Sequence, residues 1–313
     1  MRRRPPAGGT GTVAGIVLAI FGAAGFASKG VITKFLYADG WGPDSVLLTR
    51  SLLALPIIAV WALWAVGPRA LLRPPPRAAV GAAVAGCLCY YVGATLDFRA
   101  LTMIDASLER VLLFSYPSMV VVLYAGIYRE WPEPRVLGAL LVTYAGILMV
   151  VTGLDASVLR GNAAGGGLVL TCALTSALYY LASDRWTGAI GSVAFTFYAL
   201  AAATVCLGLQ RLASGDAGAS SWNARDLWLL LALVTVATVM PMLAMAEGVR
   251  RLGAPRASVV ATVGPPTTIL LGGWLLDERL RTAQWVGVAL IVAGILALEL
   301  AKRPAAAAGS QAG

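Results

Sequence analysis

Apolar runs near 20 residues long alternate with short polar breaks along almost the whole chain. About 20 apolar residues in an α-helix cross the hydrocarbon core of a bilayer, which is about 30 Å thick. The pattern therefore predicts an all-α, polytopic integral membrane protein with ten transmembrane helices. These helices are expected near residues 11–33, 46–66, 78–96, 106–127, 134–153, 165–183, 190–209, 226–246, 255–276 and 282–300.

Composition agrees with this pattern, because 59% of the residues are hydrophobic and only 12% are charged. A soluble domain is about 25% charged. We therefore expect residues 1–313 to form a single membrane domain whose surroundings are the lipid bilayer. The net charge of +9 is spread over many short loops rather than gathered on one face, so a nucleic-acid partner is not expected.

The distribution of Lys and Arg predicts the orientation. Placing the N-terminus inside puts fourteen of the 24 basic residues in inner segments and eight in outer loops, with Arg50 and Arg110 inside helices. The positive-inside rule then favours a multi-pass protein of the cytoplasmic membrane with both termini in the cytoplasm. The basic start, MRRRPPAGGT, imitates a secretory signal, but the many spans after it favour a retained first helix.

The two halves of the chain match each other at an offset of 148 residues. The matched pairs are Pro117 with Pro265, Glu130 with Glu278, and the tetrapeptide AGIL at 145–148 with AGIL at 293–296. We therefore expect two five-helix repeats, residues 11–153 and 165–300. Because five is an odd number, the repeats must be inverted relative to each other in the membrane, an arrangement typical of secondary transporters.

Prolines inside several predicted helices remove backbone hydrogen bonds and kink or interrupt them. Prolines are also common in membrane helices for structural reasons alone. For Pro117 and the pair Pro265 and Pro266, which recur in both halves, we favour a hinge or a cavity wall.

Charged side chains inside the predicted spans are concentrated in the first half. Each costs roughly 2.5 to 3.5 kcal/mol in hydrocarbon. Lys29, Arg99 and Asp105 are interpreted as helix-end side chains that reach the headgroups. Arg50 and Glu109 lie deeper, and they are either part of a translocation pathway or a structural ion pair between two helices.

Proton coupling is a further hypothesis. Asp105 and Glu109 are one helical turn apart and share a face, so each carboxylate disfavours ionisation of the other unless Arg50 or Lys34 lies between them. A carboxylate that exchanges a proton in this way could couple transport to a proton gradient.

Metal and covalent chemistry are not expected. The chain has no histidine, and its four cysteines all lie in apolar runs without metal-ligand spacing. No Ser, His or Cys constellation with catalytic spacing stands near a loop. We therefore predict no enzyme activity, no metal site and no cofactor.

Several segments resemble the drug/metabolite transporter superfamily, and specifically EamA-type bacterial permeases with two five-helix repeats. These segments are SKGVITKF (28–35), TRSLLALP (49–56), YYVGATLDF (90–98), SLERVLLFSYP (107–117) and LLDERL (275–280). The resemblance implies a cavity between the halves, alternating access, and export or uptake of a small organic solute such as an amino acid or another metabolite. By position, it implies a substrate or coupling pathway at Lys34, Arg50, Asp97, Glu109 and Arg110.

The first helix lacks the acidic residue that small multidrug relatives carry there, so cation antiport of that type is not expected. The excess of buried cations instead suggests an anionic or zwitterionic solute, unless the polar groups are mutual ion pairs. The alternatives to a transporter are a non-transporting membrane scaffold, a lipid-handling membrane protein and, more weakly, a channel. The sequence leaves the direction of transport and the oligomeric state open.

Overall fold

The structure, a computed structural model, is nearly all helical. It describes residues 9–129, 156–214, 223–253, 260–277 and 282–301, together with residues 134, 138, 141–142, 145–146, 149 and 257. No β-strand occurs among these residues. The predicted helix at 134–153, together with Glu130 and Glu278, lies largely or wholly outside the described residues.

The first half of the chain forms two long helices, one short helix and two helices interrupted by irregular segments. Its elements are α1 (Gly9–Ala38), α2 (Pro43–Val66), α3 (Pro68–Leu72), α4 (Pro76–Gly86), the π-helical η1 (Cys87–Gly93), α5 (Ala94–Ala100), α6 (Ala106–Leu113) and α7 (Tyr116–Tyr128). Proline stands in the first turn of α2, α3, α4 and α7. Its missing N–H costs no helical hydrogen bond there, because the first four N–H groups have no intrahelical acceptor.

The second half is also helical. Its elements are α9 (Ala156–Ile190), α10 (Ser192–Ser214), α11 (Ala224–Val234), the π-helical η2 (Thr235–Val239), α12 (Met240–Leu252), the 3₁₀ turn η3 (Ala261–Val263), α14 (Gly264–Leu275) and α15 (Thr282–Ala301). Helix α9 begins nine residues before the expected start of its span at residue 165.

Seven helical segments within the described residues are long and apolar enough to cross a membrane. They are Thr12–Ala38, Pro43–Val66, Pro76–Ala100, Leu108–Ile127, Gly161–Ile190, Ser192–Ser214 and Ala224–Leu252. Each overlaps one of the ten predicted spans. The protein is therefore a polytopic helical membrane protein, as the hydropathy pattern predicts.

The expected position of the paired prolines is corrected by the structure. Pro117 was predicted inside a continuous helix, but a turn at residues 114–115 ends α6, and Pro117 stands in the first turn of α7. Pro265 and Pro266 likewise stand in the first turn of α14, directly after η3. Proline cannot donate the hydrogen bond that a helix interior needs, so each break falls just before it. Their role as hinges or cavity walls stays a prediction.

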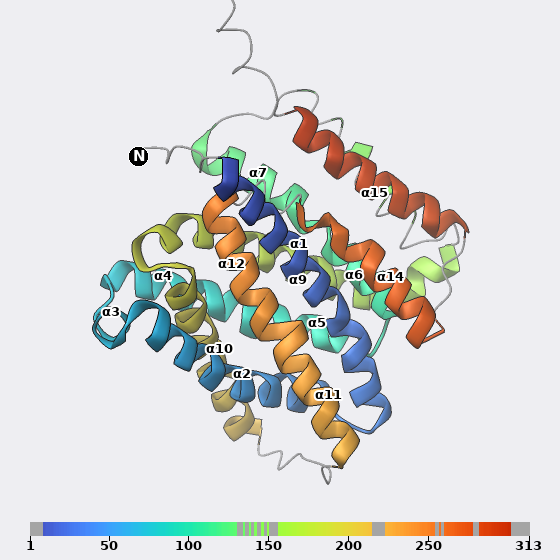
Figure 1. Ribbon diagram of the computed structural model, residues 1–313. Helices are drawn as coiled ribbons and strands as arrows, with labels where there is room; N and C mark the ends of the chain where they lie inside the picture. The colour runs from blue at the N-terminus through green and yellow to red at the C-terminus, as the bar shows by residue number, and fades with distance from the viewer. Residues whose placement is uncertain are drawn as a thin grey trace, which may run out of the picture.

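Helices of the two halves pack mainly against each other (Figure 1). The blue helix α1 lies beside the orange α12 and α14, whereas α10 packs on α2 and α4, and α9 packs on η1, α5 and α7. Small residues allow these approaches. A Cβ atom added to Gly25 of α1 would lie 2.5 Å from Cγ of Pro241 in α12, and one added to Gly86 of α4 would lie 1.9 Å from the carbonyl oxygen of Ala199 in α10. Close packing of backbones is the usual way that helices associate in lipid.

Candidate functional site

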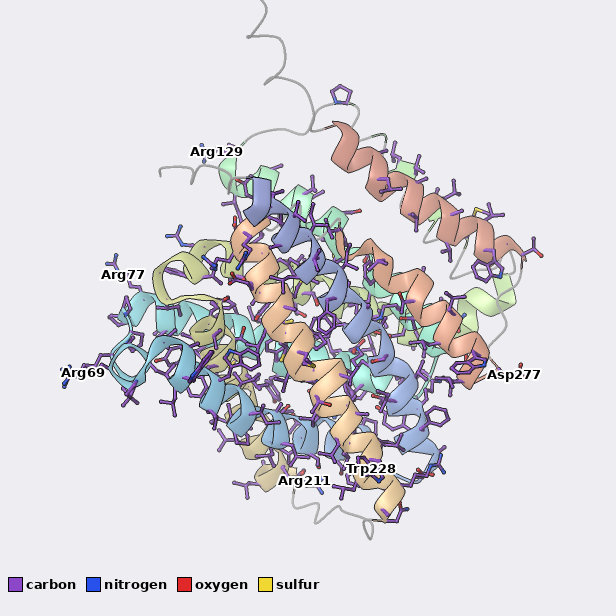
Figure 2. The ribbon with its side chains drawn as sticks, viewed as in Figure 1. Arg69, Arg77, Arg129, Arg211, Trp228 and Asp277 are labelled. Atoms are coloured by element: carbon purple, nitrogen blue, oxygen red, sulfur yellow. The ribbon has the colours of Figure 1, made fainter. Side chains whose placement is uncertain are left out.

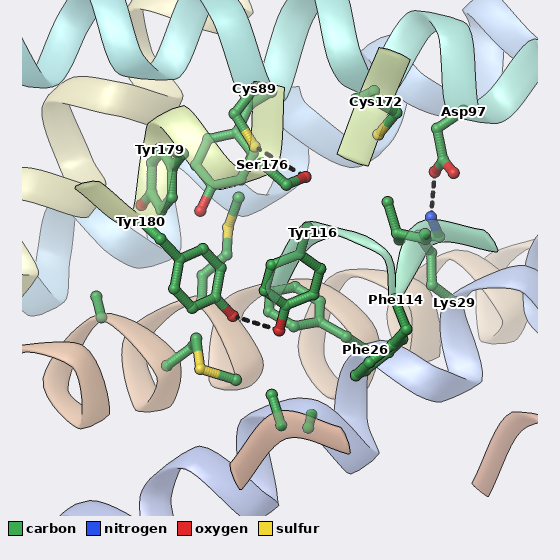
Figure 3. A pocket seen from close by; sticks show the side chains of 18 of the residues that line it. Phe26, Lys29, Cys89, Asp97, Phe114, Tyr116, Cys172, Ser176, Tyr179 and Tyr180 are labelled. Atoms are coloured by element: carbon green, nitrogen blue, oxygen red, sulfur yellow. Dashed lines mark hydrogen bonds and ion pairs between the residues drawn. The ribbon is translucent and has the colours of Figure 1, made fainter. Parts of the chain in front are cut away.

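A cavity of about 130 Å³ lies where helices of the two halves meet. Its wall is built by α1, α2, η1, α5, α6 and α7 from the first half and by α9, α12 and η3 from the second. Charged side chains gather at one end of the wall and tyrosines at the other (Figure 3). The cavity is thus polar at one end and aromatic at the other.

A buried ion cluster forms the charged end. Lys29 of α1, which is 7% exposed, contacts the carboxylate of Asp97 in α5, and its Nζ lies 3.3 Å from Oε1 of Glu109 in α6. Asp97 is 2% exposed and Glu109 is fully buried. Gly30 allows α6 to come this close, because an added Cβ would lie 3.1 Å from Cβ of Ala106. Two carboxylates therefore share one ammonium group away from water.

Two arginines lie next to this cluster and have no carboxylate as a hydrogen-bond partner within the described residues. The guanidinium of Arg50, which is 4% exposed, stacks over the ring of Phe98 with its Cζ 5.1 Å from the ring centroid. Arg110 donates to the backbone carbonyl of Phe26. The Nε atoms of both arginines are buried and make no hydrogen bond in the structure. An unpaired buried donor is costly, so both guanidinium groups have capacity left for an anionic partner.

Aromatic and sulfur-containing side chains form the other end. The hydroxyl oxygens of Tyr116 and Tyr180 lie 3.1 Å apart, which is within hydrogen-bonding distance. The ring centroids of Tyr90 and Tyr179 are 4.8 Å apart. Figure 3 shows the Tyr116 and Tyr180 hydroxyls meeting across the cavity from α7 and α9. Because Tyr116 directly follows the α6–α7 break, the break places this ring in the cavity wall.

The break in α6–α7 also meets the matching break of the second half. A Cβ atom added to Gly264, the first residue of α14, would lie 2.5 Å from Cζ of Phe114. Phe114 itself lines the cavity, as does Ala261 in η3. The two interruptions of regular helix, one from each half, therefore lie together at the cavity.

Four of the five predicted pathway residues surround this one site. Arg50, Asp97 and Arg110 line the cavity, and Glu109 contacts Lys29 at its edge. Lys34 does not belong to the group, because its Nζ donates to the carbonyl of Ile104, 2.9 Å away. This leaves Lys34 one helical turn or more from the cluster, near the end of α1.

Two other expectations differ from the structure. Lys29 was interpreted as a helix-end side chain, yet it is buried and holds the centre of the ion cluster. Asp105 was predicted to face Glu109, yet Asp105 is exposed at the start of α6, and the carboxylate that shares a partner with Glu109 is Asp97. Glu109 contacts Lys29 and not Arg50, so the alternative of an ion pair between those two residues does not hold.

The cavity tyrosines were not predicted, because tyrosine in an apolar run is equally typical of a lipid-facing helix. The doublets at 90–91 and 179–180 were the only sequence signal. Within the described residues, no three Cys, Asp or Glu side chains gather in a way that could hold a metal ion.

Comparison with known proteins identifies the family. The EamA-like transporter family model matches residues 13–152 and again residues 163–300. A transporter of Bacillus subtilis, the uncharacterized YcbK, is 30% identical over 299 residues, which cover 92% of this chain and 94% of that protein. The uncharacterized inner membrane transporter YicL of Salmonella typhimurium is 25% identical over 202 residues, covering 64% of this chain and 66% of its own length.

A crystal structure of a protein superposes with a TM-score of 0.69 at 18% sequence identity, covering 95% of this chain and all of that one. At this identity the likeness concerns the fold alone. The two matches to the family model, the transporter relatives and the apolar helical bundle lead to one conclusion: the chain is a multi-pass membrane transporter that belongs to the EamA-like transporter family.

Proposed function

We propose that this protein is a secondary active transporter that moves a small organic solute, such as an amino acid or another metabolite, across the cytoplasmic membrane by alternating access. The observation that carries the proposal is the cavity between the two halves, with Lys29, Arg50 and Arg110 buried around it. Buried charges in a membrane protein are costly and mark solute or ion pathways more often than scaffolds.

The same 148-residue offset found in the sequence recurs in the backbone, which supports two inverted five-helix repeats in ten helices. The π-helical segments η1 and η2 begin at Cys87 and Thr235, which are 148 residues apart. Two residues with a left-handed backbone conformation are separated by the same offset, namely Arg129, with φ 55°, and Asp277, with φ 53°. Irregular backbone at matched positions is difficult to explain unless both halves derive from one unit, and such repeats allow a central site to open to each side in turn.

The positions of charged residues support the proposed orientation. Arg69 and Arg77 lie at the left edge of the molecule and Arg129 lies at its upper left, and all three belong to predicted inner segments (Figure 2). Arg211 and Asp277, from predicted outer loops, lie at the bottom and right. A C-terminal reporter that is active only on the outer face would contradict this orientation.

The charges at the site favour an anionic or zwitterionic solute. Three cations, Lys29, Arg50 and Arg110, face two carboxylates, Asp97 and Glu109, so the site keeps one positive charge when all five are ionised. Arg50 and Arg110 are the groups not consumed by ion pairs. A cavity of about 130 Å³ has room for a molecule of about the size of benzene. A compact carboxylate with a small apolar body fits both ends of this cavity.

The ion cluster supports proton coupling in a revised form. Asp97 and Glu109 share Lys29, so this trio carries one surplus negative charge, and uptake of a single proton makes it neutral. We propose Glu109 as the proton-carrying residue, because it is the more distant of the two from Lys29 and is completely buried. Protonation of Glu109 would weaken its ion pair with Lys29 and so the contact between α6 and α1 near the break before α7.

Flux measurements in proteoliposomes, with and without a pH gradient, test the proposal. Candidate solutes are small monocarboxylates and amino acids, with cations of the same size as negative probes. We expect the Glu109→Gln variant to lose the response to the pH gradient, and Asp105→Asn, the exposed carboxylate one turn away, to keep it. Flux of cations but not carboxylates would contradict the solute class. A Glu109→Gln variant that keeps both flux and pH response would contradict proton coupling, and no flux for any solute would favour a scaffold.

A further inference from the structure

A second concave site lies on the outside of the bundle, separate from the central cavity. It is a groove of about 690 Å³ between α4 and α9, and it shares no lining residue with the cavity. Arg77, Val80 and Val84 of α4 and Leu88 of η1 line one side, and Ala182 and Trp186 of α9 line the other. Nothing in the transport proposal uses this groove.

One end of the groove is aromatic and basic. The indole of Trp186 lies directly against α4, because a Cβ atom added to Gly81 would be 2.3 Å from its Nε1. The guanidinium of Arg185 stacks over the same indole, 4.8 Å from the ring to Cζ. Arg77 lines the groove at this end, and both arginines are exposed. One arginine therefore stacks on a tryptophan at the groove and a second lines the groove itself, and tryptophan is a residue that favours the level of lipid headgroups.

The rest of the groove is apolar. Val80 and Val84 are 62% and 53% exposed, and with Leu88 they recur every four residues along one face of α4 and η1. From Arg77 to Leu88 the helix rises about 16 Å at about 1.5 Å per residue. Half the thickness of a hydrocarbon core is about 15 Å. The apolar length thus matches one leaflet, and the charged residues lie at only one end of it.

Charge complementarity selects the occupant. Arg69 and Arg73 precede Arg77 in the short connection around α3, and Arg69 and Arg77 project from the same edge of the molecule (Figure 2). This edge is cytoplasmic in the predicted topology. Anionic lipids are enriched in that leaflet, and basic pockets between transmembrane helices bind their headgroups.

We propose that the groove between α4 and α9 binds an anionic diacyl phospholipid of the cytoplasmic leaflet. Arg77 and Arg185 hold its phosphate, and one acyl chain lies along Val80, Val84 and Leu88. The bound lipid would hold α4 of the first half to α9 of the second. Because the groove shares no lining residue with the central cavity, this proposal stands or falls independently of the transported solute.

Native mass spectrometry of the purified protein, after equilibration with equal amounts of phosphatidylglycerol and phosphatidylcholine, tests the site. We expect preferential retention of phosphatidylglycerol. Arg77→Ala and Arg185→Ala should each reduce this retention about five-fold, the factor that corresponds to about 1 kcal/mol per basic residue. Arg211→Ala, which changes a partly exposed arginine at the bottom of the molecule in Figure 2, away from the groove, is the control and should retain the lipid as the unmodified protein does.

A second variant tests the apolar part of the groove. Val84→Trp fills the groove and leaves both arginines in place, so it should also reduce retention of the diacyl lipid. Equal retention of the two lipids, or unchanged phosphatidylglycerol binding in both arginine variants, would overturn the proposal. Displacement of the lipid by millimolar inorganic phosphate alone, or undiminished binding in Val84→Trp, would show a simple phosphate site in its place.

Discussion

Removing Lys29 should be the most destabilising single change at the ion cluster. At a separation of 3.3 Å, the attraction between Lys29 and Glu109 is about 5 kcal/mol with an effective dielectric constant of 20. Asp97 is closer still. Much of this attraction offsets the cost of burying the charges, and breaking a buried pair from one side typically costs about 3 to 5 kcal/mol. We therefore expect Lys29→Met to lower the free energy of unfolding by about 3 to 5 kcal/mol.

The net charge of Lys29, Asp97 and Glu109 then predicts the relative stabilities of the combined variants. Lys29→Met leaves the trio with two negative charges, adding Asp97→Asn returns it to one, and adding Glu109→Gln makes it neutral. Stability should therefore recover stepwise, and it should be measured by reversible unfolding in mixed detergent micelles. Lys34→Met is the control, and it should cost only about 1 kcal/mol because Lys34 makes one hydrogen bond to a backbone carbonyl. Full stability of Lys29→Met, or no recovery in the double variant, would refute the reasoning.

Two further predictions concern packing and the aromatic end. Gly86→Ala should destabilise the protein by at least about 2 kcal/mol, because the new Cβ would meet the backbone carbonyl of Ala199. Gly208→Ala is the control and should leave stability unchanged, because Gly208 faces open space. Equal unfolding midpoints for the two variants would contradict the predicted clash. Tyr116→Phe removes one side of the hydroxyl contact with Tyr180, so solute flux should fall while the unfolding midpoint shifts little. Unchanged flux would place this contact outside the pathway.

The cluster explains why the second half can lack these charges. The positions that match Glu109 and Arg110 in the second repeat are Ala257 and Ser258. The fold therefore does not need the ion cluster twice. Both halves supply the wall. Among the described residues that line it, the charged side chains all come from the first half, whereas α9 contributes two of the four tyrosines and α12 the methionines. The charged side chains of the site thus lie on one side of the cavity, which suits a solute with one charged end.

The described spans and the family could be read from the sequence, whereas the inverted arrangement of the two halves stays a prediction. An apolar run of about 20 residues is a property of local composition, so it can be recognised without the fold. All seven spans found among the described residues overlap a predicted span. The repeat offset depends on matched residues and recurs in η1 and η2. Arg50, Asp97, Glu109 and Arg110 were also recognisable, because charge in an apolar run is rare and therefore informative.

The tertiary structure decided which charges meet. Lys29 lies 68 residues from Asp97 and 80 from Glu109, and nothing local distinguishes it from Lys34, which is five positions further along the same helix. Which lysine reaches the carboxylates depends on the close approach of α1 to α6, which Gly30 permits. The neighbour of Glu109 could not be inferred from helical spacing either, because the chain breaks just before α6 and turns Asp105 outward. Local composition determines that a segment spans the bilayer, whereas contacts between distant helices determine which of its polar groups face one another.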